Sequence, residues 1–135
     1  MVQRFFSLLI VGLGLSACIA SQGRGAKLRE AVFYFNEGVR WGRVQDVVSR
    51  LDPGFEDHFR EMHKDFGNAI QITDYEMVEK VVNLDEGKAY FAIKITWYRI
   101  NELLVRETIL GQYWEENELE WYMVREEYKS GTPFS

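Results

Sequence analysis

The chain has 135 residues, with 16 Lys and Arg against 21 Asp and Glu, which gives a net charge of −5. Hydrophobic residues make up 47% of it and aromatic residues 15%, with only two prolines, and this composition is typical of one globular domain and excludes a disordered chain. Because the charge is acidic and no basic stripe is present, we expect no nucleic-acid partner.

The first 17 residues have the pattern of a signal peptide. Arg4 precedes an apolar run from Phe5 to Leu15, which is followed by small residues. As a helix the run would cover about 16 Å, roughly half of the hydrocarbon core of a bilayer, so it is too short to span a membrane. We therefore expect residues 1–17 to be removed.

The end of this segment, Leu15-Ser16-Ala17-Cys18, resembles the lipobox of bacterial lipoproteins. The resemblance implies that Cys18 becomes an acylated N-terminus, labelled by palmitate, and that the chain is anchored to a membrane. Cys18 is also the only cysteine in the chain, and the alternative is an ordinary buried thiol. In enterobacterial sorting Asp after the Cys retains a lipoprotein at the inner membrane, whereas Ile19 stands here. We therefore expect an envelope protein, with the outer membrane favoured and the domain in the periplasm.

Past the cysteine, the composition divides the chain into a tether, a domain and a tail. Residues 18–25 contain two glycines and no apolar period, which predicts a flexible tether. Residues 26–128 form the predicted domain, and residues 129–135 the predicted frayed tail.

Apolar residues at helical spacing predict three helices at the start of the domain. The first covers residues 26–40 and the second residues 41–51. The third begins with Asp52 as its N-cap and Pro53 in its first position, and it ends near Gly67. Its apolar stripe consists of Phe55, Phe59, Met62 and Phe66.

The apolar period then changes to two, which predicts four antiparallel strands joined by short turns. We place them at residues 70–82, 88–99, 103–114 and 119–126. The second strand alternates most clearly, and its face toward the helices should consist of Ala89, Phe91, Ile93, Ile95 and Trp97. Strands this long should bend strongly, with Gly111 as the site of a bulge or a bend.

The predicted final hairpin has aromatic residues on both sides of an acidic turn, Tyr113-Trp114 before it and Trp121-Tyr122 after it. Together with the order of three helices and four long strands, this pattern resembles the nuclear-transport-factor-2-like superfamily, which has a cystatin-like cone. The resemblance implies an α+β fold with helices packed on a strongly bent four-stranded antiparallel sheet. Members include ketosteroid-isomerase-like enzymes, dehydratases, small-ligand binders and protein-binding modules, so the resemblance implies no single function.

Glu107 is the first candidate for a catalytic residue. Strict alternation would place it inside the cone among apolar neighbours, namely Leu103, Val105, Ile109 and Tyr113. A carboxylate there could act as the general base of an isomerase-like or dehydratase-like enzyme, with the hydroxyl of Tyr75, or alternatively that of Tyr113, as its partner. The alternatives are an outward Glu107 paired with Arg106 or Lys94.

His58 is the second candidate, because it shares a helix flank with Glu61 and Asp65. A solvated charged flank is the alternative. The other histidine, His63, lies about 140° away around the helix axis, so the two cannot hold one metal ion together. We expect no metal and no cofactor.

The expected function is that of a membrane-anchored, non-catalytic adaptor or binding module. A protein partner, or a second copy of the chain, would dock on the outer face of the sheet through Tyr90, Tyr98 and Tyr122. One alternative is an enzyme that uses Glu107. The other is a carrier of a small apolar ligand in a cone cavity lined by Phe35, Phe59, Phe66, Ile93, Ile109 and Tyr113.

Overall fold

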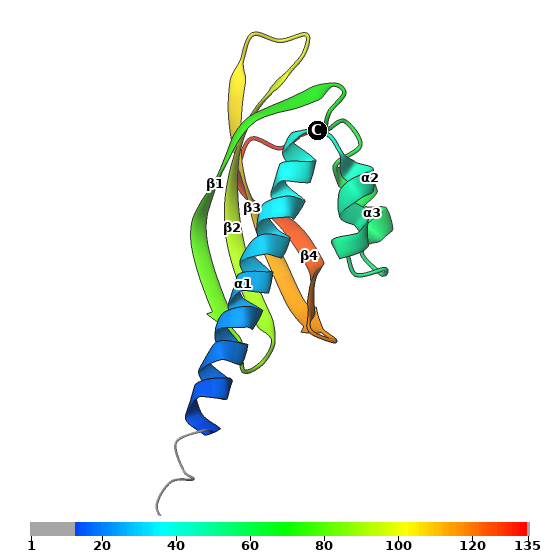
Figure 1. Ribbon diagram of the computed structural model, residues 1–135. Coiled ribbons are helices and arrows are strands. Elements are labelled where there is room, and N and C mark those ends of the chain that lie inside the picture. Colours follow the sequence, from blue (N-terminus) through cyan, green and yellow to red (C-terminus); the bar gives the residue numbers. More distant parts are fainter. Residues whose placement is uncertain (1–12, 135) are drawn as a thin grey trace, which may run out of the picture.

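A computed structural model describes the backbone of residues 13–134 and the side chains of residues 23–134. In chain order its elements are α1 (Leu13–Arg40), α2 (Val44–Val47), the 3₁₀ helix η1 (Val48–Arg50), α3 (Glu56–Met62), β1 (Ile70–Asn83), β2 (Lys88–Arg99), β3 (Val105–Asn117) and β4 (Glu120–Gly131). The helices lie on one face of the sheet (Figure 1). The predicted α+β architecture, helices first and then four strands, is confirmed.

The strands form an antiparallel meander in the order β1-β2-β3-β4. The two central strands pair in one unbroken register, from Lys88 opposite Glu115 to Tyr98 opposite Val105. Register shifts occur only where the outer strands β1 and β4 pair with their neighbours. Because bulges bend a sheet and the centre of this sheet has none, the sheet is not strongly curled, and the prediction of a strongly bent sheet is wrong (Figure 1). Gly111 pairs in register with Ala92, so the bulge predicted at Gly111 is also wrong.

One face of α1 packs on the sheet and forms the core with it. The buried apolar residues of α1 are the five that the helical spacing indicated, Leu28, Ala31, Val32, Phe35 and Val39. Opposite them the predicted inner face of β2 is buried throughout, at Ala89, Phe91, Ile93, Ile95 and Trp97. Trp114, Trp121 and Met123 complete the layer between helix and sheet, each at most 1% exposed.

The helices after α1 are shorter than predicted. The predicted second helix is reduced to α2 and η1, and α3 begins at Glu56 and not at Pro53. Asp52 accepts a hydrogen bond at Oδ2 from the backbone N–H of Gly54, at 3.1 Å, so it closes a turn that precedes the helix. α3 then ends at Met62, and Gly67, predicted as its C-cap, instead adopts φ +76° in a separate turn.

The N-terminal helix extends beyond its predicted start. Residues 18–25, predicted as a flexible tether, belong to α1. The two glycines make this segment a poorer helix former than alanine would, by about 1 kcal/mol each, so contacts with the rest of the domain help to hold it in the helix. Arg24 also joins this turn to the sheet, because its Nε lies 3.0 Å from Glu116 Oε2 and its Nη2 donates to the carbonyl of Leu84 at 2.6 Å. The tether prediction is therefore wrong for the described chain.

The C-terminal residues are not a frayed tail, because Phe134 packs against the core. β4 continues to Gly131, and the ring of Phe134 lies 4.7 Å from that of Phe66 and 5.2 Å from that of Trp97. The guanidinium of Arg99 donates to the carbonyl of Phe134. The tail prediction failed because a single aromatic residue beyond the last strand gives no periodic signal.

The predicted lipidation signal falls mostly beyond what the structure describes. Residues 1–12 of the predicted signal peptide and the side chain of Cys18 lie outside the described residues. Among the residues described, no helix has both the length and the apolar character needed to cross a membrane.

Candidate functional site

Glu107 lies on the outer face of the sheet, away from the helices. In β3 the side chains buried toward the helices are those of Thr108, Leu110, Gln112 and Trp114, one position out of phase with the prediction. Glu107 is exposed and pairs with Thr96. Together with Glu76, which contributes more, it raises the pKa of the Lys94 ammonium, as expected for charges on a solvated face. The prediction that Glu107 faces an apolar cavity is wrong, because the apolar residues Leu103 and Val105, on which the alternation rested, are exposed.

Tyr75 lies on the inner face of β1, beside α1. Its ring packs against the edge of the core, and its partner in β2 is the buried Ile95. Partial burial, and after it the nearby carboxylate of Glu37, raise the pKa of the Tyr75 phenol to about 12. Because Tyr75 and Glu107 occupy opposite faces of the sheet, they cannot act on one substrate.

His58 is exposed, and the acidic residues expected beside it have other partners. Glu61 pairs with Lys64 at 2.7 Å, and Asp65 lies 3.5 Å from Arg99. The structure thus supports the solvated flank and not an acid/base cluster. In the described part of the chain, no group of three or more metal-ligating side chains comes together.

The residues expected to line a cone cavity divide between two places. Phe35, Phe59, Phe66 and Ile93 are each at most 5% exposed and belong to one packed core cluster. The ring centroids of Phe35 and Phe59 lie 5.5 Å apart, edge to face. Ile109 and Tyr113 instead lie half-buried on the outer face of the sheet. The six residues therefore do not enclose one cavity.

The structure instead reveals a buried polar chain that begins at His63, the histidine without an expected role. The imidazole Nε2 pairs with Oε1 of Glu126, and both side chains are at most 1% exposed. Oε2 of Glu126 accepts a hydrogen bond from the amide of Gln112 at 2.8 Å. Both carboxylate oxygens of Glu126 therefore have a polar partner in the core, and one hydrogen lies between Oε1 and His63 Nε2.

The chain continues from Gln112 to α1 through a reciprocal pair of amides. Gln112 donates to Asn36 Oδ1 at 2.9 Å, and Asn36 donates to Gln112 Oε1 at 3.2 Å. The second amide hydrogen of Asn36 goes to the carbonyl of Val32 at 2.9 Å. These four side chains, which we call the polar chain, connect the C-cap of α3 with β4, β3 and α1 through the core. Among them His63 Nδ1 is the one buried polar atom without a hydrogen-bond partner in the described residues.

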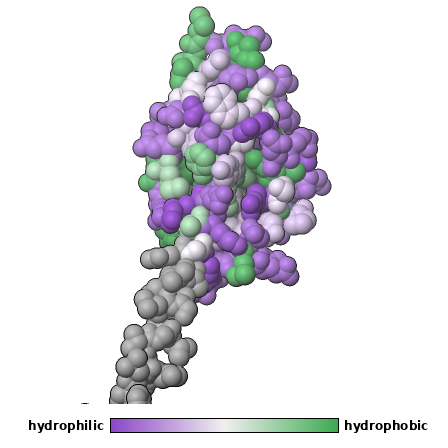
Figure 2. Space-filling view, in the orientation of Figure 1, coloured by the Kyte–Doolittle hydropathy of each residue, from purple (hydrophilic) through white to green (hydrophobic). Residues whose placement is uncertain are grey.

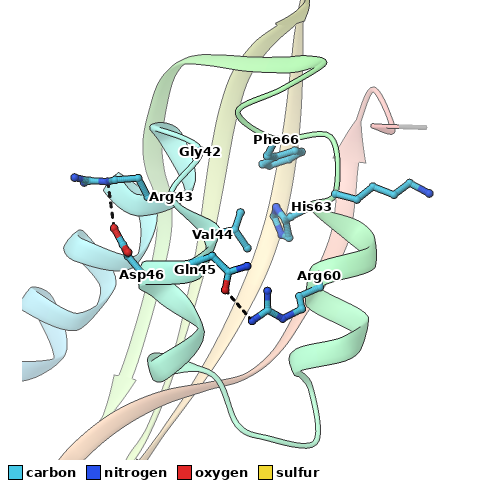
Figure 3. Close-up of a pocket in the computed structure, with 9 residues that line it drawn as sticks. Gly42, Arg43, Val44, Gln45, Asp46, Arg60, His63 and Phe66 are labelled. Carbon is cyan, nitrogen blue, oxygen red and sulfur yellow. Dashed lines mark hydrogen bonds and ion pairs between the residues drawn. The ribbon is translucent and has the colours of Figure 1, made fainter.

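A hollow of about 380 Å³ opens beside His63, between α2 and α3 (Figure 3). Its lining consists of Gly42, Arg43, Val44, Gln45, Asp46, Arg60, His63, Lys64 and Phe66. Across it the guanidinium of Arg60 donates to Gln45 Oε1 at 3.3 Å. The polar chain therefore ends beneath an opening on the helical side of the molecule.

A bulge hides this site from the sequence. In β4 the residues Trp121 and Met123 face the core, so strict alternation would bring Arg125 inside. The pairing with β3 shifts between Tyr113 and Trp114, so that β4 gains one residue and Glu126 turns inward in place of Arg125. The available signal was His63 itself, one turn after Phe59 and beside the apolar stripe of α3.

Comparison with known proteins identifies the fold and no family. No family model matches the chain, and no curated protein matches it. A protein of unknown function with a cystatin-like fold from Nostoc punctiforme superposes with a TM-score of 0.55 at 10% identity, over 82% of this chain and 92% of that one. The TraE protein, solved in complex with 2-(2-furyl)isonicotinic acid, superposes with a TM-score of 0.51 at 8% identity, over 75% of this chain and 93% of that one. The chain therefore has a cystatin-like α+β fold.

Proposed function

We propose that the chain is a lipid-anchored, non-catalytic binding module of the bacterial envelope, facing the periplasm and held at the outer membrane. The anchor is supported by the lipobox-like Leu15-Ser16-Ala17-Cys18, by Cys18 being the only cysteine, and by Ile19 after it. Acyl chains on Cys18 would hold the N-terminal end of α1 at the bilayer surface.

With an anchor at Cys18, one end of the molecule would lie near the membrane and the other end far from it. The turns after β1 and β3 lie toward the N-terminal end of α1, and the β2–β3 hairpin lies at the opposite end (Figure 1). With a rise of about 1.5 Å per residue, α1 separates Cys18 from Arg40 by roughly 33 Å. The hairpin would thus be presented to the periplasm, well away from the membrane.

The observation that carries the proposal is the apolar end of this hairpin, which we call the hairpin tip and define as Ile100, Leu103, Leu104 and Val105. Leu103 is 109% exposed, and the other three are between 56% and 61% exposed. Figure 2 shows hydrophobic side chains gathered at this end of the molecule. Contiguous exposed apolar groups commonly mark a site of protein association. The charges beside the tip cancel, because Arg106 pairs with Glu102.

The small size of the tip indicates what kind of protein would bind it. A standard flat interface uses roughly 20–30 residues on each side, far more than the four of the tip. Stable docking therefore requires a partner that encloses the tip in an apolar groove, and a second copy of this chain pairing tip to tip would not do so. We propose a different envelope protein as the partner.

The outer face of the sheet supports docking less well. Tyr90, Tyr98 and Tyr122 are only half-buried, but the chain's own side chains cover part of this surface. The ammonium of Lys129 lies 5.4 Å from the ring centroid of Tyr90, and the guanidinium of Arg125 lies 3.9 Å from that of Tyr113. The catalytic and carrier alternatives are also less well supported, because Glu107 faces solvent and the expected cavity residues are packed as core.

Two experiments test the proposal. Palmitate labelling in a bacterial host should mark the chain and should fail for Cys18→Ser. Label that persists in this variant would overturn the proposed lipid anchor.

A second experiment tests docking at the hairpin tip. We expect the double variant Leu103→Asn/Leu104→Asn to abolish a native-gel complex extracted from the envelope. Met77→Asn, which changes an apolar side chain 44% exposed in β1, should leave the complex intact. An equal loss of the complex in both variants would contradict docking at the tip.

A further inference from the structure

The start of α1 is held against the sheet by basic side chains. Arg24 pairs with Glu116, with Nε 3.0 Å from Oε2, and only 10% of the Glu116 side chain is exposed. Its Nη2 also donates to the carbonyl of Leu84 at 2.6 Å, and one turn later Lys27 lies 3.8 Å from Glu120. Because these contacts lie beside the turns after β1 and β3, those turns keep a fixed place next to the start of α1 (Figure 1).

These contacts leave little chain between the sheet and the proposed anchor. Cys18 precedes Arg24 by six residues, and both belong to the unbroken helix α1. Six residues cover about 9 Å as a helix, and roughly 20 Å even when fully extended. An acyl group on Cys18 therefore keeps the two turns close to the bilayer surface, and the proposal below rests on that anchor.

The two turns form an end of the molecule that is strongly acidic. We define this anchor-facing end as residues 83–88 and 115–120, which contain six acidic residues and one basic residue, Lys88. Two of the acidic side chains are neutralised by Arg24 and Lys27. The other four are exposed and form no ion pair within the described part of the chain, namely Asp85, Glu86, Glu115 and Glu118. These four free carboxylates against one ammonium leave the end with an excess of negative charge.

Apolar surface is scarce at the same end. Leu119, in the turn after β3, is 63% exposed, whereas Leu84 is half-buried. A segment that lies among lipids needs a continuous apolar face, and one exposed leucine does not provide it. The response of the anchor-facing end to a membrane is therefore decided by its charge.

We propose that anionic lipid head groups repel the anchor-facing end, so that the anchored domain stands upright with the hairpin tip directed away from the bilayer. A bilayer that contains anionic lipids has a negative surface potential, which acts over about one Debye length, roughly 8 Å at physiological salt. Because a helix joins the end to the anchor, the end is highest when α1 is perpendicular to the bilayer and approaches the surface as α1 tilts. Repulsion therefore opposes tilting on an anionic bilayer, whereas zwitterionic head groups carry no net charge and leave the domain free to tilt.

The test measures the height of the full chain above supported bilayers by neutron reflectometry. The chain is coupled through Cys18, its only cysteine, to a maleimide lipid, which supplies the anchor whether or not cells acylate this residue. One bilayer is phosphatidylcholine alone, and the other also contains phosphatidylglycerol. On the anionic bilayer we expect the protein layer to lie farther from the head groups by about one Debye length, roughly 8 Å at 0.15 M salt. At 1 M salt, where the Debye length is about 3 Å, the difference should disappear.

Two double variants with the same change in net charge separate the anchor-facing end from the acidic chain as a whole. Asp85→Asn/Glu118→Gln removes two of its free carboxylates and should reduce the height difference at least twofold. Asp57→Asn/Asp74→Asn removes two exposed carboxylates from α3 and from the first half of β1, and should leave the difference unchanged. Equal heights on the two bilayers, or equal effects of the two double variants, would overturn the proposal. Because the maleimide lipid replaces acylation, this result is separate from the palmitate labelling.

Discussion

Replacement of Glu126 by leucine is the sharpest test of the polar chain. The carboxylate is buried and accepts hydrogen bonds from His63 and Gln112. Leucine is of similar size but accepts neither, so the imidazole Nε2 and one amide hydrogen lose their partner in the core. Breaking a buried pair in this way typically costs about 3–5 kcal/mol. For a domain of this length each kcal/mol lowers Tm by roughly 4–8 °C, so we expect Tm to fall by roughly 12 °C or more.

Glu127→Leu is the matched control. Glu127 is the next residue of β4, half-buried on the outer face, where it accepts a hydrogen bond from the hydroxyl of Tyr113 at 2.8 Å. Its loss should cost about 1 kcal/mol. Urea denaturation at pH 7 gives both free energies of unfolding. If Glu126→Leu cost less than about 1 kcal/mol, or no more than Glu127→Leu, Glu126 would not be a buried member of a hydrogen-bonded chain.

Three further predictions concern Tyr75, Gly42 and the C-terminus. Because the folded pKa of Tyr75 is about 12 and the usual value is 10, its neutral phenol stabilises the fold below pH 10, and that contribution is lost as the pH rises from 10 to 12. Near pH 10 the rise in tyrosinate absorbance of the wild-type chain should therefore be smaller, by one phenol, than that of an equimolar mixture of Tyr75→Phe and free tyrosine. Equal rises in absorbance would contradict the raised pKa of Tyr75. Gly42→Ala should destabilise the fold by about 2 kcal/mol or more, because Gly42 has a positive φ and a Cβ there would lie 2.5 Å from the Cα of Gly67. Gly23→Ala, in open space within α1, should stabilise it by up to about 1 kcal/mol. Thermal unfolding compares the two variants, and equal effects would refute the close approach of Gly42 and Gly67. Phe134→Ala should cost about 3 kcal/mol in chemical denaturation, because its ring contacts Phe66 and Trp97, and a neutral result would restore the frayed tail.

Much of the fold follows from the sequence because periodicity reports burial directly. The spacing of Leu28, Val32 and Phe35 predicted the buried face of α1, and the alternation from Ala89 to Trp97 predicted the inner face of β2. All four strands were located within a few residues, except that β4 continues to Gly131. In β2 the inner face is uniformly apolar and the period of two is undisturbed, and in α1 Asn36 is the one buried polar residue beside the five apolar ones.

The candidate site could not be predicted, because it depends on departures from periodicity. A one-residue bulge in β4 brings Glu126 inside, and nothing in the local sequence marks it. In β3 the exposed Leu103 and Val105 gave an apolar alternation of the wrong phase, which misplaced Glu107. Polar residues at core positions, such as Gln112 and Asn36, are recognised only once their partners from distant segments are known.

Site-specific photo-crosslinking in intact cells most directly tests whether this chain is an anchored binding module. A photoreactive residue would replace Leu103 at the hairpin tip, with Glu118, exposed in the turn after β3 at the opposite end, as the control position. We expect one discrete adduct with a different envelope protein from position 103 only, and its loss when Leu104→Asn is added. Equal adducts from both positions, or an adduct of twice the chain's own mass, would contradict a tip that docks a separate partner.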